Sequence, residues 1–343
     1  MSLRDAKSDL YHIAKKRNGD ISQKLGIKIA LRQRGKGRWN MIYTLTLNPA
    51  IDYRMNTQKI IHGDTNRALS EELSFGGKGI NVSKVLKNLG IESKALGFCA
   101  GFTGAALVSH LDECGINNDF VELCGGNTRI NVKLCDGQNC ETEINACGPK
   151  VSEDEKNILF DKIKNTVSDG DTLILSGSVP SGMGGETYAC IIELVKDKNI
   201  RIVVDAQGEL LLNTLRHKPF LVKPNLSELC GIVGKDLSTP DEIAGGAKKL
   251  RELGARNVLV SLGADGALLA DENGIITSVC SHKGDAINTV GAGDSMVAGF
   301  VAGADEGYEY ALRLANACGG ATAFSVGLAE KECVEKLLKT KNA

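Results

Sequence analysis

The spacing of apolar residues from Met41 onward alternates between two patterns. Short β-branched runs end in Gly, Pro or Asn turns, and the stretches between them show the apolar spacing of amphipathic helices. Strands are predicted within residues 41–52, 92–101, 171–180, 200–208, 219–225 and 257–263, and helices within 79–90, 104–115, 185–199 and 241–254. Strands joined by helices of this length form right-handed βαβ units. The pattern therefore predicts an α/β fold with a mostly parallel sheet.

Two stretches, residues 51–75 and 127–146, break this alternation because they read as successive strands without helices. In the second, Asp136-Gly137 marks a turn between two strands. We expect the two stretches to form a small antiparallel sheet that projects from the main one.

Composition excludes several classes of protein. Hydrophobic residues make up 42% of the chain and charged residues 24%. No apolar run approaches the roughly 18 residues that a membrane span needs, and no secretory signal is evident. The eleven cysteines include no Cys-x-x-Cys pair, and Cys135 and Cys140 have no nearby His to complete a zinc site. We expect a soluble, cytoplasmic protein with reduced thiols and no membrane partner.

Charge is distributed unevenly along the chain. The first 40 residues hold 11 basic and 3 acidic side chains, whereas the remaining 303 hold 30 basic and 39 acidic ones. The body of the protein is thus mildly acidic, which disfavours nucleic acid as a partner.

Residues 1–40 are predicted to be a basic extension outside the domain that begins at Met41. One interpretation is a basic arm for nucleic acid or an acidic surface, and another is a segment that simply lies outside the fold. The third, which we favour, is that the segment is not native. Gly37-Arg38-Trp39 can be encoded by GGG-AGG-TGG, which resembles a bacterial ribosome-binding site upstream of a start codon at Met41.

The segment from Asn288 to Phe300, NTVGAGDSMVAGF, is the most informative for chemistry. Gly291 and Gly293 allow backbone N–H groups to face an anion, and the helix that follows adds partial positive charge at the same point. Such a nest suits a phosphoryl group in transfer, and Asp294 is placed to accept the proton of an attacking hydroxyl. Taken alone, the motif fits a tight turn with a helix cap equally well. Walker, Rossmann and protein-kinase motifs are absent from the sequence.

Two long segments, GGKGINVSKVLKNLG (76–90) and NTVGAGDSMVAGF (288–300), resemble the signatures of the ribokinase-like carbohydrate kinases, in the phosphofructokinase B group. Two such signatures in the right order are far more specific than either alone. The resemblance runs from Met41 to near the C-terminus. It implies one kinase domain, 41–343, folded as a three-layer α/β/α sandwich with a β lid made of residues 51–75 and 127–146.

Further segments, among them TLNPAIDY, TRINVKL, KPNLSEL and VSLGADGALL, resemble the branch of this family that acts on sugar phosphates. The resemblance implies phosphorylation of fructose 1-phosphate to fructose 1,6-bisphosphate, with ATP and Mg²⁺. Phosphorylation of tagatose 6-phosphate is a close alternative, and a non-catalytic sugar-phosphate sensor is a third. A homodimer formed through the lid is compatible with the resemblance.

The resemblance also assigns roles to residues. It makes Asp294 the catalytic base and Gly291, Ala292 and Gly293 the anion hole. The residues that it places around ATP are Lys223, Asn225, Ser261, Leu262, Gly263, Ala264, Asp265, Gly266, Gly293 and Asn316. Asn225 and Glu228 stand at positions i and i+3, so both can face magnesium and its waters from one helical turn.

For the sugar phosphate, the resemblance points to Asp52 and Asn81 as partners of sugar hydroxyls, with Gly77 close by. Asp52 is expected to end the first strand. Alternation puts Arg129, Asn131 and Lys133 on one face of a strand and Ile130, Val132 and Leu134 on the other. A solvated sheet edge would explain the cations. With Lys78 they would instead suit a substrate phosphate, and the resemblance favours that interpretation.

Overall fold

The computed structural model describes residues 41–136 and 141–340. The predicted N-terminal extension lies outside the described residues, and so does the part of the predicted turn that follows Asp136.

Within the described residues, nine strands form one sheet in the order β13-β12-β11-β10-β9-β8-β1-β4-β5. Neighbouring strands from β11 to β5 are parallel, and β12 and β13 add an antiparallel edge. Their bounds are β1 Ile42–Thr46, β4 Ser93–Ala100, β5 Asn117–Leu123, β8 Thr172–Ser176, β9 Arg201–Asp205, β10 Leu221–Val222, β11 Asn257–Ser261, β12 Ala267–Ala270 and β13 Ile276–Val279. The predicted parallel sheet is confirmed.

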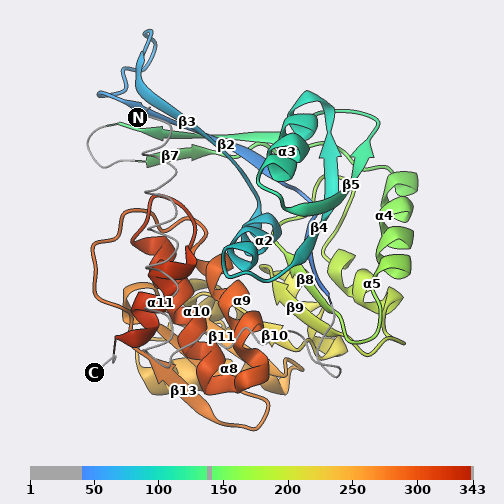
Figure 1. Ribbon diagram of the computed structural model, residues 1–343, viewed down its shortest axis with the longest axis vertical. Coiled ribbons are helices and arrows are strands. Elements are labelled where there is room, and N and C mark those ends of the chain that lie inside the picture. The colour runs from blue at the N-terminus through green and yellow to red at the C-terminus, as the bar shows by residue number, and fades with distance from the viewer. Residues whose placement is uncertain (1–40, 137–140, 341–343) are drawn as a thin grey trace, which may run out of the picture. The chain divides into compact units, whose positions relative to one another are not determined.

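Helices cover both faces of this sheet (Figure 1). On one face, buried apolar side chains of α2, α9, α10 and α11 pack on the sheet; on the other, those of α4, α5, α7 and α8 do so. The bounds are α2 Lys78–Asn88, α3 Gly101–Glu113, α4 Glu153–Thr166, α5 Thr187–Leu194, α6 Glu209–Leu212, α7 Leu226–Val233, α8 Pro240–Glu252, α9 Ala292–Gly303, α10 Tyr308–Ala323 and α11 Lys331–Lys339, with 3₁₀ turns at Leu215–His217, Gly263–Asp265 and Ala304–Glu306. The fold is therefore the expected three-layer α/β/α sandwich. No described helix has the length and apolarity to cross a bilayer.

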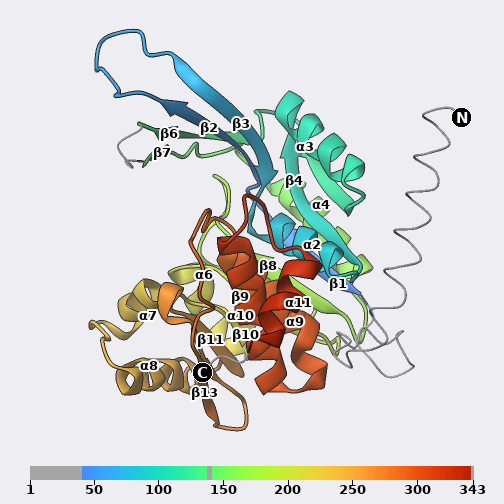
Figure 2. The same ribbon diagram turned by 60° about the vertical axis from the view of Figure 1, so that its left-hand side comes forward.

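A second sheet, which we call the lid, consists of β3 (Ala68–Gly76), β2 (Ala50–Thr57), β6 (Arg129–Cys135) and β7 (Glu141–Ile144), in that order. Figure 2 shows β2 and β3 extending away from the main sheet. The expectation of a purely antiparallel lid was wrong, because β2 and β6 pair in parallel. Both strands follow segments that leave the carboxyl edge of the main sheet, so they run outward in the same direction.

Asp52 was expected to end the first strand, and this too was wrong. The first strand ends at Thr46, and a new one begins at Ala50, so that Asp52 lies inside β2 of the lid. Asn48 and Pro49 interrupt the apolar alternation too briefly for the sequence to mark two strands. Asp52 therefore belongs to the predicted lid segment 51–75 alone, where it forms part of the wall that the lid presents to the site.

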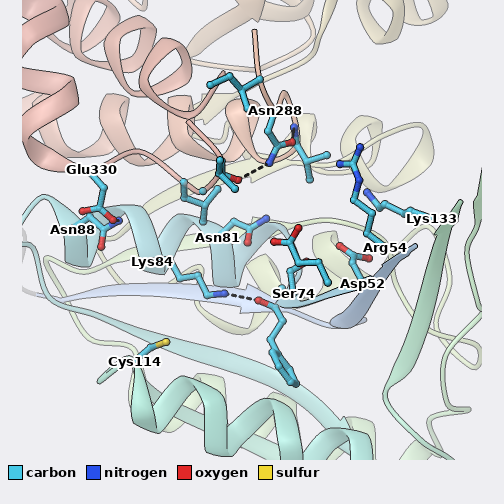
Figure 3. Close-up of a pocket in the computed structure, with 18 of the residues that line it drawn as sticks. Asp52, Arg54, Ser74, Asn81, Lys84, Asn88, Cys114, Lys133, Asn288 and Glu330 are labelled. Atoms are coloured by element: carbon cyan, nitrogen blue, oxygen red, sulfur yellow. Dashed lines mark hydrogen bonds between the residues drawn. The ribbon is translucent and has the colours of Figure 1, made fainter. Parts of the chain in front are cut away.

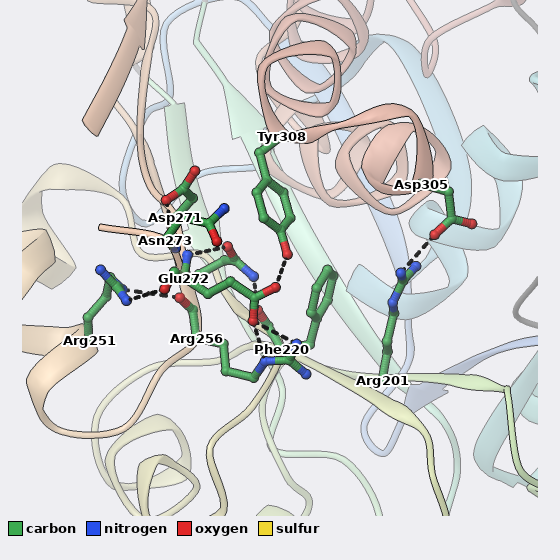
Figure 4. A network of polar contacts seen from close by, with 10 residues as sticks. Arg201, Phe220, Arg251, Arg256, Asp271, Glu272, Asn273, Asp305 and Tyr308 are labelled. Atoms are coloured by element: carbon green, nitrogen blue, oxygen red, sulfur yellow. Dashed lines mark hydrogen bonds and ion pairs between the residues drawn. The ribbon is translucent and has the colours of Figure 1, made fainter. Parts of the chain in front are cut away.

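Charged side chains form a network of hydrogen bonds and ion pairs at the amino edge of the main sheet, which lies opposite its carboxyl edge (Figure 4). Glu272 receives hydrogen bonds from Arg256, at 2.6 Å, and from the Tyr308 hydroxyl. Arg201, the first residue of β9, pairs with Asp305 at 2.7 Å. The guanidinium groups of Arg201 and Arg256 lie 4.8 and 5.4 Å from the centre of the Phe220 ring. These contacts fix α10 to the sheet far from the edge at which β9 ends.

Candidate functional site

The segment with the Gly-Ala-Gly-Asp motif opens α9 at the carboxyl edge of the main sheet. Gly291 precedes the helix with φ +79°, and a side chain there would meet Leu328 at 2.5 Å, so glycine is required. The N–H groups of a first helical turn have no acceptor within the helix, and no side chain caps this one. The Ala292 N–H does donate to the Thr289 carbonyl at 3.2 Å. Gly293 and Asp294 are therefore the better sources of free donors for an anion.

Asp294 is buried, with 6% of its surface exposed. Its Oδ2 accepts a hydrogen bond from the side-chain amide of Asn81 at 2.8 Å. Asn81 lies in the first turn of α2, where its N–H bonds the carbonyl of Gly77. Gly77 has φ +135°, and a side chain there would collide with Thr46 at 2.6 Å. The hydrogen bond between Asn81 and Asp294 thus joins the two signature segments of the sequence.

A second carboxylate, Asp205, lies next to this pair at the end of β9. Its Oδ1 is 3.1 Å from the Lys78 ammonium and 3.4 Å from that of Lys223. Lys223 also lies against α9, because a side chain on Gly293 would come within 3.1 Å of its Nζ. Two cations therefore converge beside the first turn of α9.

The charges around Asp294 and Asp205 shift the pKa values of these two carboxyl groups in opposite directions. Burial, followed by the negative charge of Asp205, raises the pKa of Asp294 to about 6, although Lys78, Asn81 and Lys223 act in the opposite direction. For Asp205, burial also opposes ionisation, but Lys223 and Lys78 outweigh it and hold the pKa of Asp205 below its ordinary value. Asp205 is the permanent anion, and Asp294 is the group poised to exchange a proton near neutral pH.

A cavity of about 660 Å³ lies between the lid, α2 and the loops that precede α9 and α11 (Figure 3). Asn81 is near its centre, and Asp52, Arg54 and Lys133 line the lid end. Asp52 accepts a hydrogen bond from Asn131 at 2.8 Å. The predicted alternation of β6 is confirmed, since Asn131 and Lys133 are buried while Ile130 is 39% exposed.

One row of charged residues crosses all four lid strands on the cavity side. Glu72, Arg54, Lys133 and Glu143 are successive partners in the strand register, and Lys133 pairs with Glu143 at 3.2 Å. In this structure the predicted partners of Lys133 contact other groups. Arg129 donates to the carbonyls of Asn48 and Ala146 at the base of the lid, and Lys78, as the first residue of α2, reaches Asp205.

The predicted nucleotide segments also come together. Ser261 ends β11 and forms a parallel bridge with Asn225, so the loops that follow β10 and β11 are adjacent. Ser261–Gly266 closes through a hydrogen bond from the Leu262 N–H to the Gly266 carbonyl at 2.9 Å. Asn316, on α10, is 6% exposed and donates to the Cys280 carbonyl at 2.9 Å.

Asn225 and Glu228 form a capping box at the start of α7. The Glu228 N–H donates to Asn225 Oδ1 at 2.8 Å, and the Asn225 N–H donates to Glu228 Oε2 at 2.9 Å. Gln207 donates to the other oxygen of Glu228. Both predicted magnesium residues therefore already have a structural role.

Sequence analysis missed Asp205 and Arg54. A signal existed for each: Asp205 follows the apolar run Ile202-Val203-Val204 directly, where a strand ends, and Arg54 stands two residues after Asp52 on one strand face. Neither lies in the segments that carry the family resemblance most clearly.

A family model described as pfkB family carbohydrate kinase matches residues 40–335. The chain belongs to this family. As a pfkB carbohydrate kinase it is a phosphotransferase that uses ATP, so the expected family and enzyme class are confirmed. The alternative of a non-catalytic sensor finds no support in this result.

Relatives of this pfkB kinase include proteins named 1-phosphofructokinase and D-tagatose-1-phosphate kinase. The Bacillus subtilis protein named 1-phosphofructokinase is 43% identical over 87% of this chain and 97% of its own length. A Borreliella burgdorferi protein of the same name is 40% identical over 87% and 96%. The Bacillus licheniformis protein named D-tagatose-1-phosphate kinase is 37% identical over 88% and 97%.

Solved structures agree on the fold. A putative phosphofructokinase from Staphylococcus aureus has a TM-score of 0.75 at 41% identity and covers 87% of this chain and 96% of its own. Phosphofructokinase-2 from Escherichia coli, in complex with substrates and products, has a TM-score of 0.82 at 31% identity and covers 87% and 98%. Arabidopsis thaliana ribokinase, with a TM-score of 0.72 at 22% identity over 88% of this chain and 99% of its own, shares the fold.

Proposed function

We propose that this kinase transfers the terminal phosphoryl group of ATP to fructose 1-phosphate and forms fructose 1,6-bisphosphate. The observation that carries the proposal is the arrangement of the cavity. The buried acid Asp294 is joined to it through Asn81, and a lid wall with Asp52 and Lys133 closes its other end. A ketose phosphate has a hydroxyl at one end and a phosphate at the other. Its hydroxyl would lie towards the acid Asp294, and its phosphate would lie towards the cation Lys133. Relatives at 43% and 40% identity carry the name of this activity.

In the proposed reaction, the ionised Asp294 accepts the proton of the sugar hydroxyl. The hydroxyl oxygen forms a bond to the γ-phosphorus while the bond from that phosphorus to the bridging oxygen breaks, and its electron pair leaves with ADP. A pKa of about 6 leaves Asp294 mostly ionised at pH 7 yet still basic enough to take the proton. Of the predicted anion hole, the N–H groups of Gly291 and Gly293, together with that of Asp294, would face the charge on the γ-phosphoryl oxygens, because the Ala292 N–H is bonded to the Thr289 carbonyl.

Asp52, at the lid end, would accept hydrogen bonds from sugar hydroxyls. Asn81, near the centre of the cavity, would donate hydrogen bonds to them or accept from them. Lys133 and Arg129 would hold the substrate phosphate, and Lys78 would approach the substrate from the side of Asp205. Lys133 is 8% exposed, which supports a strong interaction with an anion inside the cavity.

ATP would occupy the carboxyl edge of the sheet along Ser261–Gly266. Lys223 and Asn225 would face its phosphates, and Asn316 would lie towards the adenine. The bridge between Asn225 and Ser261 supports this proposal because it brings the loops that follow β10 and β11 together.

Mg²⁺ is proposed as the metal of the reaction. No group of three or more His, Cys, Asp or Glu side chains suited to a metal occurs among the described residues. Kinases, however, hold Mg²⁺ largely through substrate phosphates and water, so one carboxylate suffices. Glu228, half-buried at the start of α7, fits that role, with Asn225 beside it. When bound, the ion would neutralise charge on the ATP phosphates.

Tagatose 1-phosphate is the second candidate substrate, since relatives at 37% and 33% identity are named D-tagatose-1-phosphate kinase. Tagatose 6-phosphate, expected as the alternative from the sequence, remains a further one. The test measures ADP release with fructose 1-phosphate, fructose 6-phosphate, tagatose 1-phosphate and tagatose 6-phosphate. We expect kcat/KM for fructose 1-phosphate to exceed the others at least about tenfold, which is a difference of about 1.4 kcal/mol. A higher value for any other sugar phosphate refutes the assignment.

We further propose that the kinase forms a homodimer through the outer face of the lid. The side chains of Leu73, Tyr53, Val132 and Ile144 form a row across this face, and Leu73 and Ile144 are 56% and 58% exposed. Apolar rows of this kind are commonly covered by a partner. A structure of the Escherichia coli phosphofructokinase-2 is described as a tetrameric inhibited form, so relatives do assemble.

The kinase domain is proposed to span residues 41–343, with the extension 1–40 outside it. A cytoplasmic location is proposed because the reaction consumes ATP.

A further inference from the structure

Asp205 is the buried charge that the proposed reaction leaves without a role. It is 1% exposed, at the end of β9. Its Oδ1 forms ion pairs with two ammonium groups, that of Lys78 at 3.1 Å and that of Lys223 at 3.4 Å. Its Oδ2 is among the buried polar atoms that have no hydrogen-bond partner in the described part of the chain. A carboxylate with one oxygen unpaired is costly to bury, so its presence here calls for a reason beyond stability.

The three residues come from separate parts of the fold. Asp205 ends a central strand, Lys78 begins α2 and Lys223 follows β10. Lysine side chains are long and flexible, and two ammonium groups a few ångströms apart repel each other. A shared carboxylate cancels this repulsion and fixes both lysines. Lys223 is thereby held against Gly293, at the start of α9.

We propose that Asp205 is a positioning residue, which holds the ammonium groups of Lys78 and Lys223 in place beside the first turn of α9, where the phosphoryl group is transferred. The inference rests on the proposed function and deepens it. Asp205 touches neither substrate in this scheme; it acts through the two lysines and through its negative charge next to Asp294.

Several charged groups surround Asp294, and all must be considered for its pH dependence. Asp205 raises the pKa of Asp294, while Lys78 and Lys223 lower it together with the hydrogen bond from Asn81. Glu228 contributes to the field at Lys78, and the negative charge of Asp205 acts on the buried Tyr188, whose hydroxyl donates to the Gly177 carbonyl. Removing the charge of Asp205 leaves both lysines to stabilise the Asp294 carboxylate. The pKa of Asp294 should then fall.

The experiment compares Asp205→Asn, which removes the charge, with Asp205→Glu, which keeps the charge but displaces it. Asp271→Asn is the matched control, because Asp271 is also a buried aspartate, 5% exposed, but it caps the turn after β12. The assay measures kcat from pH 5 to 8, together with KM for fructose 1-phosphate. Sugar phosphates themselves titrate near pH 6, so the variants are compared with one another on the same substrate.

For Asp205→Asn we expect kcat to fall about 10²-fold, as for a misplaced catalytic group, with KM for fructose 1-phosphate changed less than about threefold. The acidic limb of the curve of kcat against pH should move to lower pH. Asp205→Glu should lower kcat about tenfold and leave the limb in place, and Asp271→Asn should leave both unchanged. Wild-type kcat and an unmoved limb in Asp205→Asn would overturn the inference.

Two further outcomes are also decisive. If Asp205→Asn does not fold, as judged by circular dichroism, Asp205→Glu decides: a kcat within about twofold of wild type overturns the inference, and a larger loss with the limb in place supports it. If the wild-type protein phosphorylates no sugar phosphate, the proposed function fails instead. ATP binding by calorimetry then tests Asp205 by itself, since misplaced lysines should weaken it about tenfold or more, and unchanged binding overturns the inference.

Discussion

The side-chain amide of Asn81 donates a hydrogen bond to Oδ2 of Asp294 at 2.8 Å, across 213 residues of sequence. This contact joins the first turn of α2, next to the cavity, to the first turn of α9, next to the nucleotide loops. It leaves Oδ1 of Asp294 available for the proton of a substrate hydroxyl, and it ties the base to the wall along which the sugar would bind.

Asp294→Asn should lower kcat by a factor on the order of 10² to 10⁴, the usual contribution of a positioned base. The amide preserves size, so the affinities for ATP and fructose 1-phosphate should change little. Steady-state kinetics and calorimetry measure the two effects separately. Near-normal turnover would remove Asp294 from the mechanism.

The pH dependence of turnover should report the environment of Asp294. The base acts when ionised, so kcat should fall as pH drops through about 6. The hydrogen bond from Asn81 lowers the pKa of Asp294 by favouring its ionised form. Asn81→Ala should therefore move the acidic limb to higher pH. Asn88→Ala, on the same helix but bonded to Ala329 and Glu330, is the control and should leave the limb in place.

Arg129→Ala and Lys133→Ala should each raise KM for fructose 1-phosphate about 10-fold to 100-fold, because charge-assisted hydrogen bonds to a phosphate are worth roughly 1.5 to 3 kcal/mol. KM for ATP should hardly move. Unphosphorylated fructose has no phosphate to lose, so its poor turnover should be indifferent to both changes. Equal weakening of ATP and sugar phosphate would show that these cations act elsewhere.

Leu73→Glu should dissociate the proposed dimer, since it places a charge in the apolar row of the outer lid face. Light scattering after size exclusion measures the mass. Ile158→Glu, on α4, alters a side chain of nearly equal exposure, 55% against 56%, and should leave the mass unchanged. A wild-type protein that is monomeric at assay concentration would contradict the proposal directly.

A shortened chain that begins at Met41 should fold and phosphorylate as well as the full chain. The Met41 N–H donates to Asp171 Oδ1 at 2.9 Å, and a free α-amino group there keeps this bond and adds a favourable charge. Thermal unfolding and the ADP-release assay make the comparison. A large loss of stability or activity would show that residues 1–40 contribute to the domain.

The sequence by itself determined the architecture, the lid strand that lines the cavity and the turn that carries the proposed catalytic base. Apolar periodicity is a local property, so the alternation of strands and helices, the alternation of Arg129, Asn131 and Lys133 on β6, and the glycine turn before Asp294 could all be predicted. The family followed from two segments that retain their full signature, and the family match confirmed it.

Only the tertiary structure decided which of these residues meet. Strand pairing depends on contacts between distant segments, so the parallel pairing of β2 with β6 was not evident from local pattern. The partner of Lys78 is likewise a matter of geometry: the start of α2 faces the end of β9, and its ammonium therefore binds Asp205. Asp205 lies in a segment without a distinctive motif. Its importance arises from burial beside two lysines and Asp294, a charge balance that exists only once four separate segments have folded together.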